Sequence, residues 1–388
     1  MLVNVLVMFV LVLAAATVIG LIVYWPDGDR IRAPEGTTPQ QTEAAKVVGV
    51  HSTPCARVAR VRDCLRVTAE LKSGPDEGRE IQFTFAAAEG NFDVGDRIRV
   101  YKNRLPPEAI DAGGRVDPYA FSDFERRPPM LWLLAGFAGL VLLTGRWQGL
   151  RALAGLGASL AIIVFFVVPA ILEGQSPTGV AFIGALAVML VTIPLAHGIG
   201  PKTVAACLGT AVSLTLTLLL ADTFIEFSHL SGVTSEEAVF LRATQQELSL
   251  QGLVLAGMVI GALGVLDDLT VSQSSTVMAL RRANPSLSFR QLFRSALTVG
   301  HDHIAATVNT LVLAYAGASL PILLVFSLAD TSLGEAINFE VVAEAVIGML
   351  VGSIGLIAAV PVTTALAALL ALRLERGGLR DAHAGHAH

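Results

Sequence analysis

The sequence predicts a predominantly α-helical membrane protein that carries one small β-rich domain. Three observations lead to this fold class. Hydrophobic residues make up 53% of the chain and charged residues only 15%, whereas soluble proteins average roughly a quarter charged. Apolar runs long enough to cross a bilayer recur along the chain. One earlier stretch instead alternates apolar and polar residues, as half-buried strands do. We therefore expect about eight transmembrane helices plus a small β-barrel-like domain of OB or SH3 type.

Residues 1–25 hold no charged side chain and are predicted to form the first transmembrane helix. A cleaved signal peptide has a basic start and an apolar core of about 7–15 residues, and this segment has neither. The small residues Ala14 to Ala16 keep cleavage open as the alternative. We favour an uncleaved signal anchor, since its length fits the roughly 20 residues of a span. Residues 26–42, rich in Pro, Gly and Thr, follow as a linker.

Residues 43–125 form the predicted β domain. Period-two alternation marks strands in residues 64–71 and 81–85, which residues 73–78 join as a hairpin loop. About five short strands are expected. Cys55 and Cys64 are close enough in sequence to form a disulfide across a hairpin or between neighbouring strands, provided that the domain lies outside the cytoplasm. Two buried free thiols are the alternative.

Seven further apolar runs make up a predicted transmembrane domain over residues 129–372. The runs are 130–145, 152–172, 178–196, 203–221, 249–280, 296–327 and 341–372. Positive charges gather in one set of connecting loops and in the tail 373–388, whereas the opposite set holds only Arg242. Cytoplasmic loops carry the excess of Lys and Arg. We therefore expect both termini in the cytoplasm, and the β domain outside a bacterial cytoplasmic membrane that the chain crosses several times.

Two segments of the transmembrane domain match each other. Residues 257–282 align with residues 348–373, and glycines coincide at Gly257 and Gly348 and at two further positions. This pattern predicts a parallel repeat, with a chance match between Gly-rich helices as the alternative. In the alignment Asp267 and Asp268 replace alanines, which marks one copy as specialised.

Polar residues inside the predicted spans point to a site. An ionisable group within hydrocarbon costs at least about 2.5–3.5 kcal/mol, so it usually faces a cavity, a partner or a pathway. The first cluster lies in the run that ends near Arg281. Its members are Asp267, Asp268, Ser272, Ser274 and Ser275. These carboxylates lie within the bilayer if the helix continues past them, or at the cytoplasmic interface if it ends near Leu266.

A second cluster lies in the next span and consists of Asp302, His303, Asn309 and Thr310. At 100° per residue Asp302 and Asn309 share a helix face. We predict that the two clusters face each other and form a site for a small ion or solute. The alternative is that they hydrogen-bond one another and lock two helices together. His301 and His303 lie about 200° apart, so a regular helix cannot offer both to one metal.

The sequence excludes some functions and leaves three open. Walker, GxSxG, HExxH and dinucleotide motifs are absent, so ATP-driven and standard hydrolytic chemistry have no support. The net charge of −5 has no basic block that would favour nucleic acid. No cofactor is predicted, although a bound cation is compatible with the carboxylates. The histidines of the tail hold a metal loosely or are solvated, and these are His383, His386 and His388.

The leading hypothesis is a secondary transporter, acting as a monomer or small homo-oligomer in the lipid bilayer. The second is a non-transporting assembly or sensing protein whose β domain binds an envelope protein. The third is a metal-dependent membrane enzyme that uses Asp267, Asp268 and His303.

Several motifs resemble the YibE/F-like family of bacterial multispanning proteins. They are Gly261 to Asp268, Ser272 with Ser274 and Ser275, Gly300 to Asp302, Asn309 to Leu311, Ala314 to Gly317, Leu320 with Pro321, and Glu173 to Pro177. The resemblance covers the chain after the anchor and implies a transporter-like layout. It places Asp268, Ser272, Ser274, Ser275, Asp302, Asn309 and Thr310 on the family pattern. His301 departs from it, since arginine is expected there, and this favours the aspartates over the histidines as the site.

Overall fold

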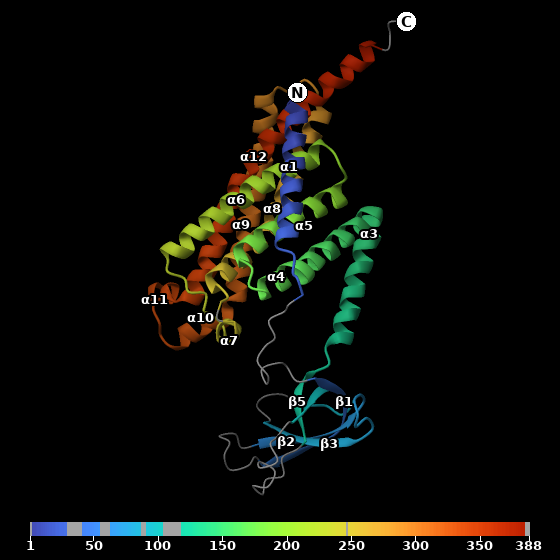
Figure 1. Cartoon of the computed structure of the whole chain (residues 1–388), viewed down its shortest axis with the longest axis vertical. Coiled ribbons are helices and arrows are strands. Elements are labelled where there is room, and N and C mark those ends of the chain that lie inside the picture. Colours follow the sequence, from blue (N-terminus) through green and yellow to red (C-terminus); the bar gives the residue numbers. More distant parts are fainter. Residues whose placement is uncertain are drawn as a thin grey trace. The chain divides into compact units, whose positions relative to one another are not determined.

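The computed structural model describes residues 2–28, 41–54, 63–86, 91–103, 118–245 and 247–384. The chain divides into two compact units, one of Met1–Arg32 with Val141–His388 and one of Ala33–Leu140. The first unit is a bundle of helices, and the second holds a small sheet and the start of helix α3 (Figure 1). The structure is therefore mostly helical, as predicted, with one β-rich part. The predicted linker falls largely outside the described residues.

Five antiparallel strands form the sheet, in the order β3-β2-β1-β4-β5. Their bounds are β1 (Thr42–Pro54), β2 (Asp63–Leu71), β3 (Glu80–Ala86), β4 (Arg97–Lys102) and β5 (Tyr119–Phe124). The predicted alternation is confirmed, because Val67, Ala69 and Leu71 of β2 are buried and so are Ile81 and Phe83 of β3. Burial of every second residue places one face of the sheet on the core.

Aromatic rings bring the two edge strands of the sheet together. Phe85 on β3 packs edge to face against Phe121 on β5, with ring centroids 5.2 Å apart. Phe92, from the β3–β4 connection, contacts these two rings at 5.2 and 5.0 Å. Since the edge strands meet across one aromatic core, the sheet is curled. A curled sheet agrees with the barrel-like shape that the sequence predicts.

Helices account for most of the remaining described chain. They are α1 (Leu2–Val23), α3 (Arg127–Ile162), the π-helix η2 (Ile163–Val167), α4 (Val168–Leu172), α5 (Pro177–His197), α6 (Pro201–Phe227), α7 (Glu236–Thr244), α8 (Leu250–Ala283), α9 (Phe289–Ala318), α10 (Leu320–Leu328), α11 (Leu333–Asn338) and α12 (Glu340–Ala384). Serines begin several of them. Ser176, Ser249 and Ser288 cap α5, α8 and α9, since each hydroxyl accepts a backbone N–H three residues on.

Six described helical segments are long and apolar enough to cross a membrane, or seven if the bent pair α9 and α10 is one span. The expected eight therefore becomes six or seven by this count. The difference lies in residues 130–145 and 152–172, which this count takes together as one segment, Arg127–Leu172, of 46 residues. Arg146 interrupts that segment with non-helical backbone angles, φ 49° and ψ −124°. The predicted run 296–327 also differs, because the chain bends by 58° between α9 and α10.

Helices α8 and α12 lie side by side and run in the same direction. Near the start of α8, Met258 approaches Gly348 of α12, and fifteen residues later Gln273 of α8 hydrogen-bonds Thr364 of α12. The contacts keep the same order along both helices, so the helices are parallel. These are the two segments that the sequence aligns as a repeat. Helix α6 packs against both of them and completes the centre of the bundle.

Helix α1 packs along the bundle. Val10 and Leu13 contact the main core cluster, and a side chain added at Gly20 would meet Ile183 of α5. Beyond the helix, the carboxylate of Glu173 accepts hydrogen bonds from the backbone N–H groups of Asp27 and Gly28 at 2.7 and 2.9 Å. The end of α1 and the end of α4 therefore lie at the same end of the bundle.

Candidate functional site

Asp267 lies halfway along α8 and its carboxylate is partly buried among α3, α5 and α8. The Thr192 hydroxyl of α5 donates a hydrogen bond to Oδ2 at 3.3 Å. The other oxygen, Oδ1, is fully buried and accepts no hydrogen bond from any described residue. A buried polar atom without a partner is costly and uncommon. Among the buried side-chain atoms of the described helical unit that lack a partner, it is the only carboxylate oxygen, which makes it the strongest mark of a site there.

A cavity of about 190 Å³ lies beside Asp267. Its walls are mostly apolar, with Ser159 and Thr192 as the polar groups apart from Asp267. Water occupies about 30 Å³ per molecule in the liquid, so the volume suits a few water molecules or a small ion. Gly264 leaves the cavity open, because a side chain added there would meet no atom within 4 Å.

The π-helix η2 forms one wall of this cavity. Ile163 and Val167, which begin and end η2, both line it. A π-helical turn inserts one residue into an α-helix at some cost in stability, and such turns occur frequently at functional sites. Gly184 of α5, which also lines the cavity, approaches Val167 so closely that an added Cβ would lie 2.6 Å from its Cγ2. The backbone irregularity and the unpaired carboxylate oxygen thus belong to the same cavity.

One stripe of α8 links this cavity to a second and larger one. Leu253 and Gly257 line a cavity of about 430 Å³ near the start of α8, and Ile260, Gly264 and Asp267 line the smaller one. The spacings of four, three, four and three residues place all five on the same helix face. Gly257 and Asp267 are about 15 Å apart along the axis at 1.5 Å per residue.

The larger cavity contains a carboxylate that the sequence analysis did not single out. Glu344, in the second turn of α12, lines it and accepts a hydrogen bond from the Thr234 hydroxyl at 2.9 Å. Tyr315 of α9 lines the same cavity. The signal for Glu344 was present, since it is an acidic residue inside the predicted apolar run 341–372.

Glu340, one turn before Glu344, holds the connection that precedes α7. Its carboxylate accepts hydrogen bonds from the backbone N–H groups of Ser231 and Gly232 and from the Ser231 hydroxyl. Gly232 has a φ of 75°, and a Cβ there would lie 2.7 Å from the backbone oxygen of Leu250. Glu340 therefore has a structural role, whereas Glu344 faces a cavity.

A seam of hydroxyl groups and glycines joins α6, α8 and α12 in the core. Thr210 and Thr270 share a hydrogen bond of 2.6 Å, and Gln273 donates to Thr364 at 2.7 Å. Side chains added at Gly209 or Gly355 would collide with threonine hydroxyls, at 2.0 and 2.1 Å. Small residues and hydroxyl pairs of this kind let apolar helices approach closely. The seam is close-packed, so we assign it to helix packing.

The predicted serine cluster of α8 does not reach across to α9 through its hydroxyls. Ser272 donates to the carbonyl of Leu269, and Ser274 and Ser275 both donate to that of Val271, at 2.7 to 3.0 Å. Each hydroxyl thus bonds within its own helix, a common alternative for serine in a helix. Gln273, between these serines, makes the interhelical contacts instead.

The second predicted cluster lies on the exposed side of α9. Asp302, His303, Asn309 and Thr310 are all exposed, and Thr310 bonds back to the carbonyl of Ala306 at 3.0 Å. Leu297, Ile304, Val308 and Leu311 form the stripe of α9 that packs on the core. Within the described residues no hydrogen bond or ion pair joins this cluster to Asp267 or Asp268. A site shared by Asp268 and Asp302 stays a prediction.

Asp268 is exposed, unlike its neighbour Asp267. It interacts electrostatically with His197 at the end of α5, as does Lys202 at the start of α6. Asp268 therefore belongs to the end of the bundle where α5 meets α6. Over the part of the chain that the structure describes, no group of three or more His, Cys, Asp or Glu residues is arranged to hold a metal.

The remaining cysteine and histidine predictions fall mostly outside the described residues. Cys64 is the second residue of β2, but Cys55 lies outside the described residues, so their disulfide stays a prediction. Cys207 is a buried free thiol in α6. The side chains of the histidine tail are not described.

The described chain is a mostly helical protein with several helices long and apolar enough to cross a membrane, and it holds a partly buried acidic group beside a cavity. The family model described as YibE/F-like protein matches residues 133–373, well over half of the chain. The chain therefore belongs to the YibE/F-like family, as its motifs predict. The match runs from α3 to α12 and leaves out α1 and the five strands. Comparison with curated proteins and with solved structures gives no match.

Proposed function

We propose that this protein is a permease-like secondary transporter that moves a small cation or a proton, with Asp267 as its binding group. The observation that carries the proposal is the buried Oδ1 of Asp267, which has no partner in the described chain and adjoins a cavity. A carboxylate in apolar surroundings needs a partner, and a cation or a proton supplies one. The cavity volume of about 190 Å³ favours a small ion over a large solute.

The stripe of α8 supports a route toward this group. Glu344 in the larger cavity offers a carboxylate at the end of the bundle that holds α7, and Gly257 and Gly264 leave open space between it and Asp267. An acidic entrance raises the local concentration of cations. Ile260 and Leu263 line the smaller cavity on the side of α8 that leads toward Gly257, and the proposed route passes them.

The proposed topology places α7 outside a bacterial cytoplasmic membrane. The ends of α1 and α4 lie at the same end of the bundle, because Glu173 binds the backbone of Asp27 and Gly28. The chain between Gly28 and Glu173 therefore begins and ends on the same side of the bilayer, so it crosses the bilayer an even number of times. At about 1.5 Å per residue, Arg127–Leu172 is also far longer than the roughly 30 Å of a hydrocarbon core. Two crossings that meet near Arg146 satisfy both conditions and restore eight spans.

Purified full-length protein in proteoliposomes tests the function. Proton and cation uptake is followed with trapped dyes for wild type, Asp267→Asn, Asp268→Asn and Asp302→Asn. We expect at least about a tenfold loss for Asp267→Asn, and near wild-type flux for Asp268→Asn, the matched change at the exposed neighbour. Undiminished flux in Asp267→Asn, with loss in Asp268→Asn and Asp302→Asn, would transfer the role to the site predicted from sequence.

The second candidate function is a non-transporting assembly or sensing protein that binds an envelope partner through its β domain. A cavity of about 540 Å³ in the β-rich unit favours it. Deletion of residues 43–125 distinguishes the two functions. If the protein that lacks residues 43–125 loses partner binding but keeps its flux, the β domain has the assembly or sensing role. The transporter proposal is judged by the flux measurements alone.

A further inference from the structure

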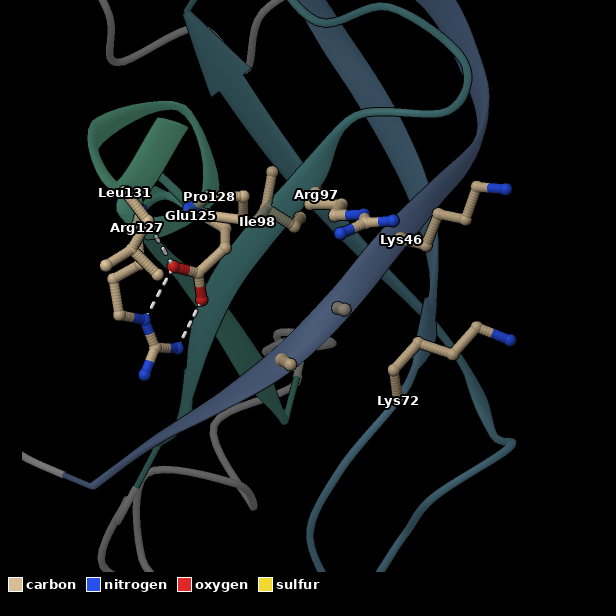
Figure 2. Close-up of a pocket in the computed structure, with 10 residues that line it drawn as sticks. Lys46, Lys72, Arg97, Ile98, Glu125, Arg127, Pro128 and Leu131 are labelled. Atoms are coloured by element: carbon tan, nitrogen blue, oxygen red, sulfur yellow. Dashed lines mark hydrogen bonds and ion pairs between the residues drawn. The ribbon is translucent and has the colours of Figure 1, made fainter. Parts of the chain in front are cut away.

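A cavity in the β-rich unit combines an apolar floor with a row of positive charges. It has a volume of about 540 Å³ and lies between strands β1 and β4, the end of β2 and the first turn of α3. Ala44, Pro128 and Leu131 provide apolar surface, whereas the side chain of Ile98 is fully buried in the core of the sheet. The cations are Lys46, Lys72 and Arg97, which project along one side in Figure 2.

Two of these cations have no acidic partner among the described residues. Lys46 and Arg97 are directly opposite each other in the β1–β4 register, and both are exposed. Like charges opposite each other on neighbouring strands are destabilising. Glu70 is the cross-strand neighbour of Lys46 on β2, but its carboxylate pairs with Lys72 instead. The repulsion between Lys46 and Arg97 is therefore not relieved from within the described chain.

The acidic residue of the cavity is already neutralised. Glu125 pairs with Arg127 through both carboxylate oxygens. Its Oε1 accepts a hydrogen bond of 2.7 Å from Nε of Arg127, and its Oε2 accepts one from Nη2 of the same side chain. Figure 2 shows this pair on the opposite side of the cavity from Lys46 and Arg97. Arg99 adds a further positive charge 3.9 Å from Glu125. The net charge facing the cavity is therefore positive, which suits an anion.

The position of the cavity in the chain indicates which anion. Arg127, Pro128 and Leu131 belong to the first turns of α3, the start of a candidate membrane span. The next residue, Trp132, is 80% exposed. Tryptophan at the end of a span is typical of the headgroup level of a bilayer. At that level the abundant anions are phospholipid phosphates, which attract Lys and Arg.

We infer that this cavity binds the headgroup of an anionic phospholipid. Lys46 and Arg97 contact the phosphate, and the apolar surface of Ala44, Pro128 and Leu131 receives the glycerol and the start of an acyl chain. A free phosphate ion would use the same cations but would gain nothing from this apolar surface. The β-rich unit is thereby linked to the membrane surface in addition to its covalent attachment to α3.

Full-length protein purified in a neutral detergent tests the inference. Binding of short-chain phosphatidylglycerol, phosphatidylcholine and inorganic phosphate is measured by titration for wild type, for Lys46→Gln with Arg97→Gln, and for Arg66→Gln with Arg79→Gln. The last pair removes the same charge from exposed positions of the β-rich unit that do not line the cavity. Thermal unfolding of each variant verifies that the fold is retained.

We expect phosphatidylglycerol to bind wild type at least tenfold more tightly than either of the other ligands. Lys46→Gln with Arg97→Gln should weaken that binding by about tenfold or more, since each cation near the surface contributes about 1 kcal/mol. The control pair should change it less than threefold. Equal weakening by both pairs, or inorganic phosphate binding as tightly as the lipid, would overturn the inference.

Discussion

The Gln273 side chain of α8 donates a hydrogen bond of 2.7 Å to the Thr364 hydroxyl of α12, and these two residues are 91 positions apart in the chain. That separation equals the offset of the predicted repeat, so positions that the alignment makes equivalent touch each other. The same Gln273 amide also donates to the backbone carbonyl of Ala296 in α9 at 2.9 Å. One side chain thus connects three helices at the centre of the bundle.

Removal of the Thr364 hydroxyl should weaken this junction. Thr364→Val keeps the shape of the side chain but removes the acceptor, and we expect a loss of about 0.5–1.5 kcal/mol in the free energy of unfolding. Gln273→Ala should cost more, about 2–4 kcal/mol, because it also leaves a cavity. Unfolding of purified protein by denaturing detergent measures both. Simple additivity in the double variant would contradict a direct interaction between these side chains.

Glycine substitutions should separate close helix packing from helix propensity. Gly209→Ala places a Cβ 2.0 Å from the Thr363 hydroxyl and 3.3 Å from its Cα, so α6 and α12 must move apart. We expect a destabilisation of about 1–3 kcal/mol. Gly157→Ala in α3 meets no atom within 4 Å and should be neutral or stabilising by up to about 1 kcal/mol. The same unfolding assay compares the pair, and equal effects would refute the close approach.

Filling the smaller cavity should abolish transport without unfolding the protein. Gly264→Met adds a flexible apolar side chain next to Asp267, where a Cβ has open space. We expect flux to fall at least about tenfold, while the thermal unfolding temperature changes by no more than a few degrees. Gly257→Ala, a smaller change in the wider cavity, should retain most of the flux. Normal flux in Gly264→Met would exclude this cavity from the route.

The β-rich unit should lose stability in acid. Hydrogen bonds from Lys102 and then Tyr119 lower the pKa of Asp76 below its ordinary 3.8, and Arg127 lowers the pKa of Glu125 from 4.5 to about 2. Carboxyls with a depressed folded-state pKa stabilise the fold above the unfolded value, and this stabilisation disappears as pH falls through the folded value. The loss should therefore occur between about pH 4.5 and pH 2.

Hydrogen exchange of peptides from β2 to β5, followed by mass spectrometry across this range, measures the acid effect. Asp76→Asn, which cannot ionise, should be less stable than wild type at pH 7 and should show a shallower decline on acidification. Curves for the two proteins that run parallel from pH 7 to pH 2 would rule out Asp76 as a contributor.

Much of the fold was predictable because buried residues follow a pattern in the sequence that depends on the type of element. Alternation identified β2 and β3, and long apolar runs identified α5, α6 and α8. The break at Arg146 was harder to interpret. Apolar content marks residues 130–145 and 152–172 as candidate spans, but it does not show whether the polar residues between them end a helix or only bend it. That outcome depends on backbone angles that composition does not record.

The site was less predictable than the fold. The sequence marked Asp267 and Asp268 together, and only packing distinguishes the partly buried carboxylate from the exposed one. Thr192, 75 residues away, gave no signal of its contact with Asp267. Asp302 shares a face with Asn309 as helix geometry requires, but the apolar stripe of α9 decides that this face is exposed. Both results come from tertiary contacts between distant segments.

Infrared difference spectroscopy of the purified full-length protein tests the central claim most directly, because it detects the protonation state and cation contacts of a carboxyl group. Spectra recorded on change of pH, and on exchange of sodium or potassium for a bulky organic cation, are compared for wild type, Asp267→Asn and Asp268→Asn. The account predicts a carboxyl band that responds in wild type and Asp268→Asn and is missing in Asp267→Asn. An identical response in all three proteins would contradict it.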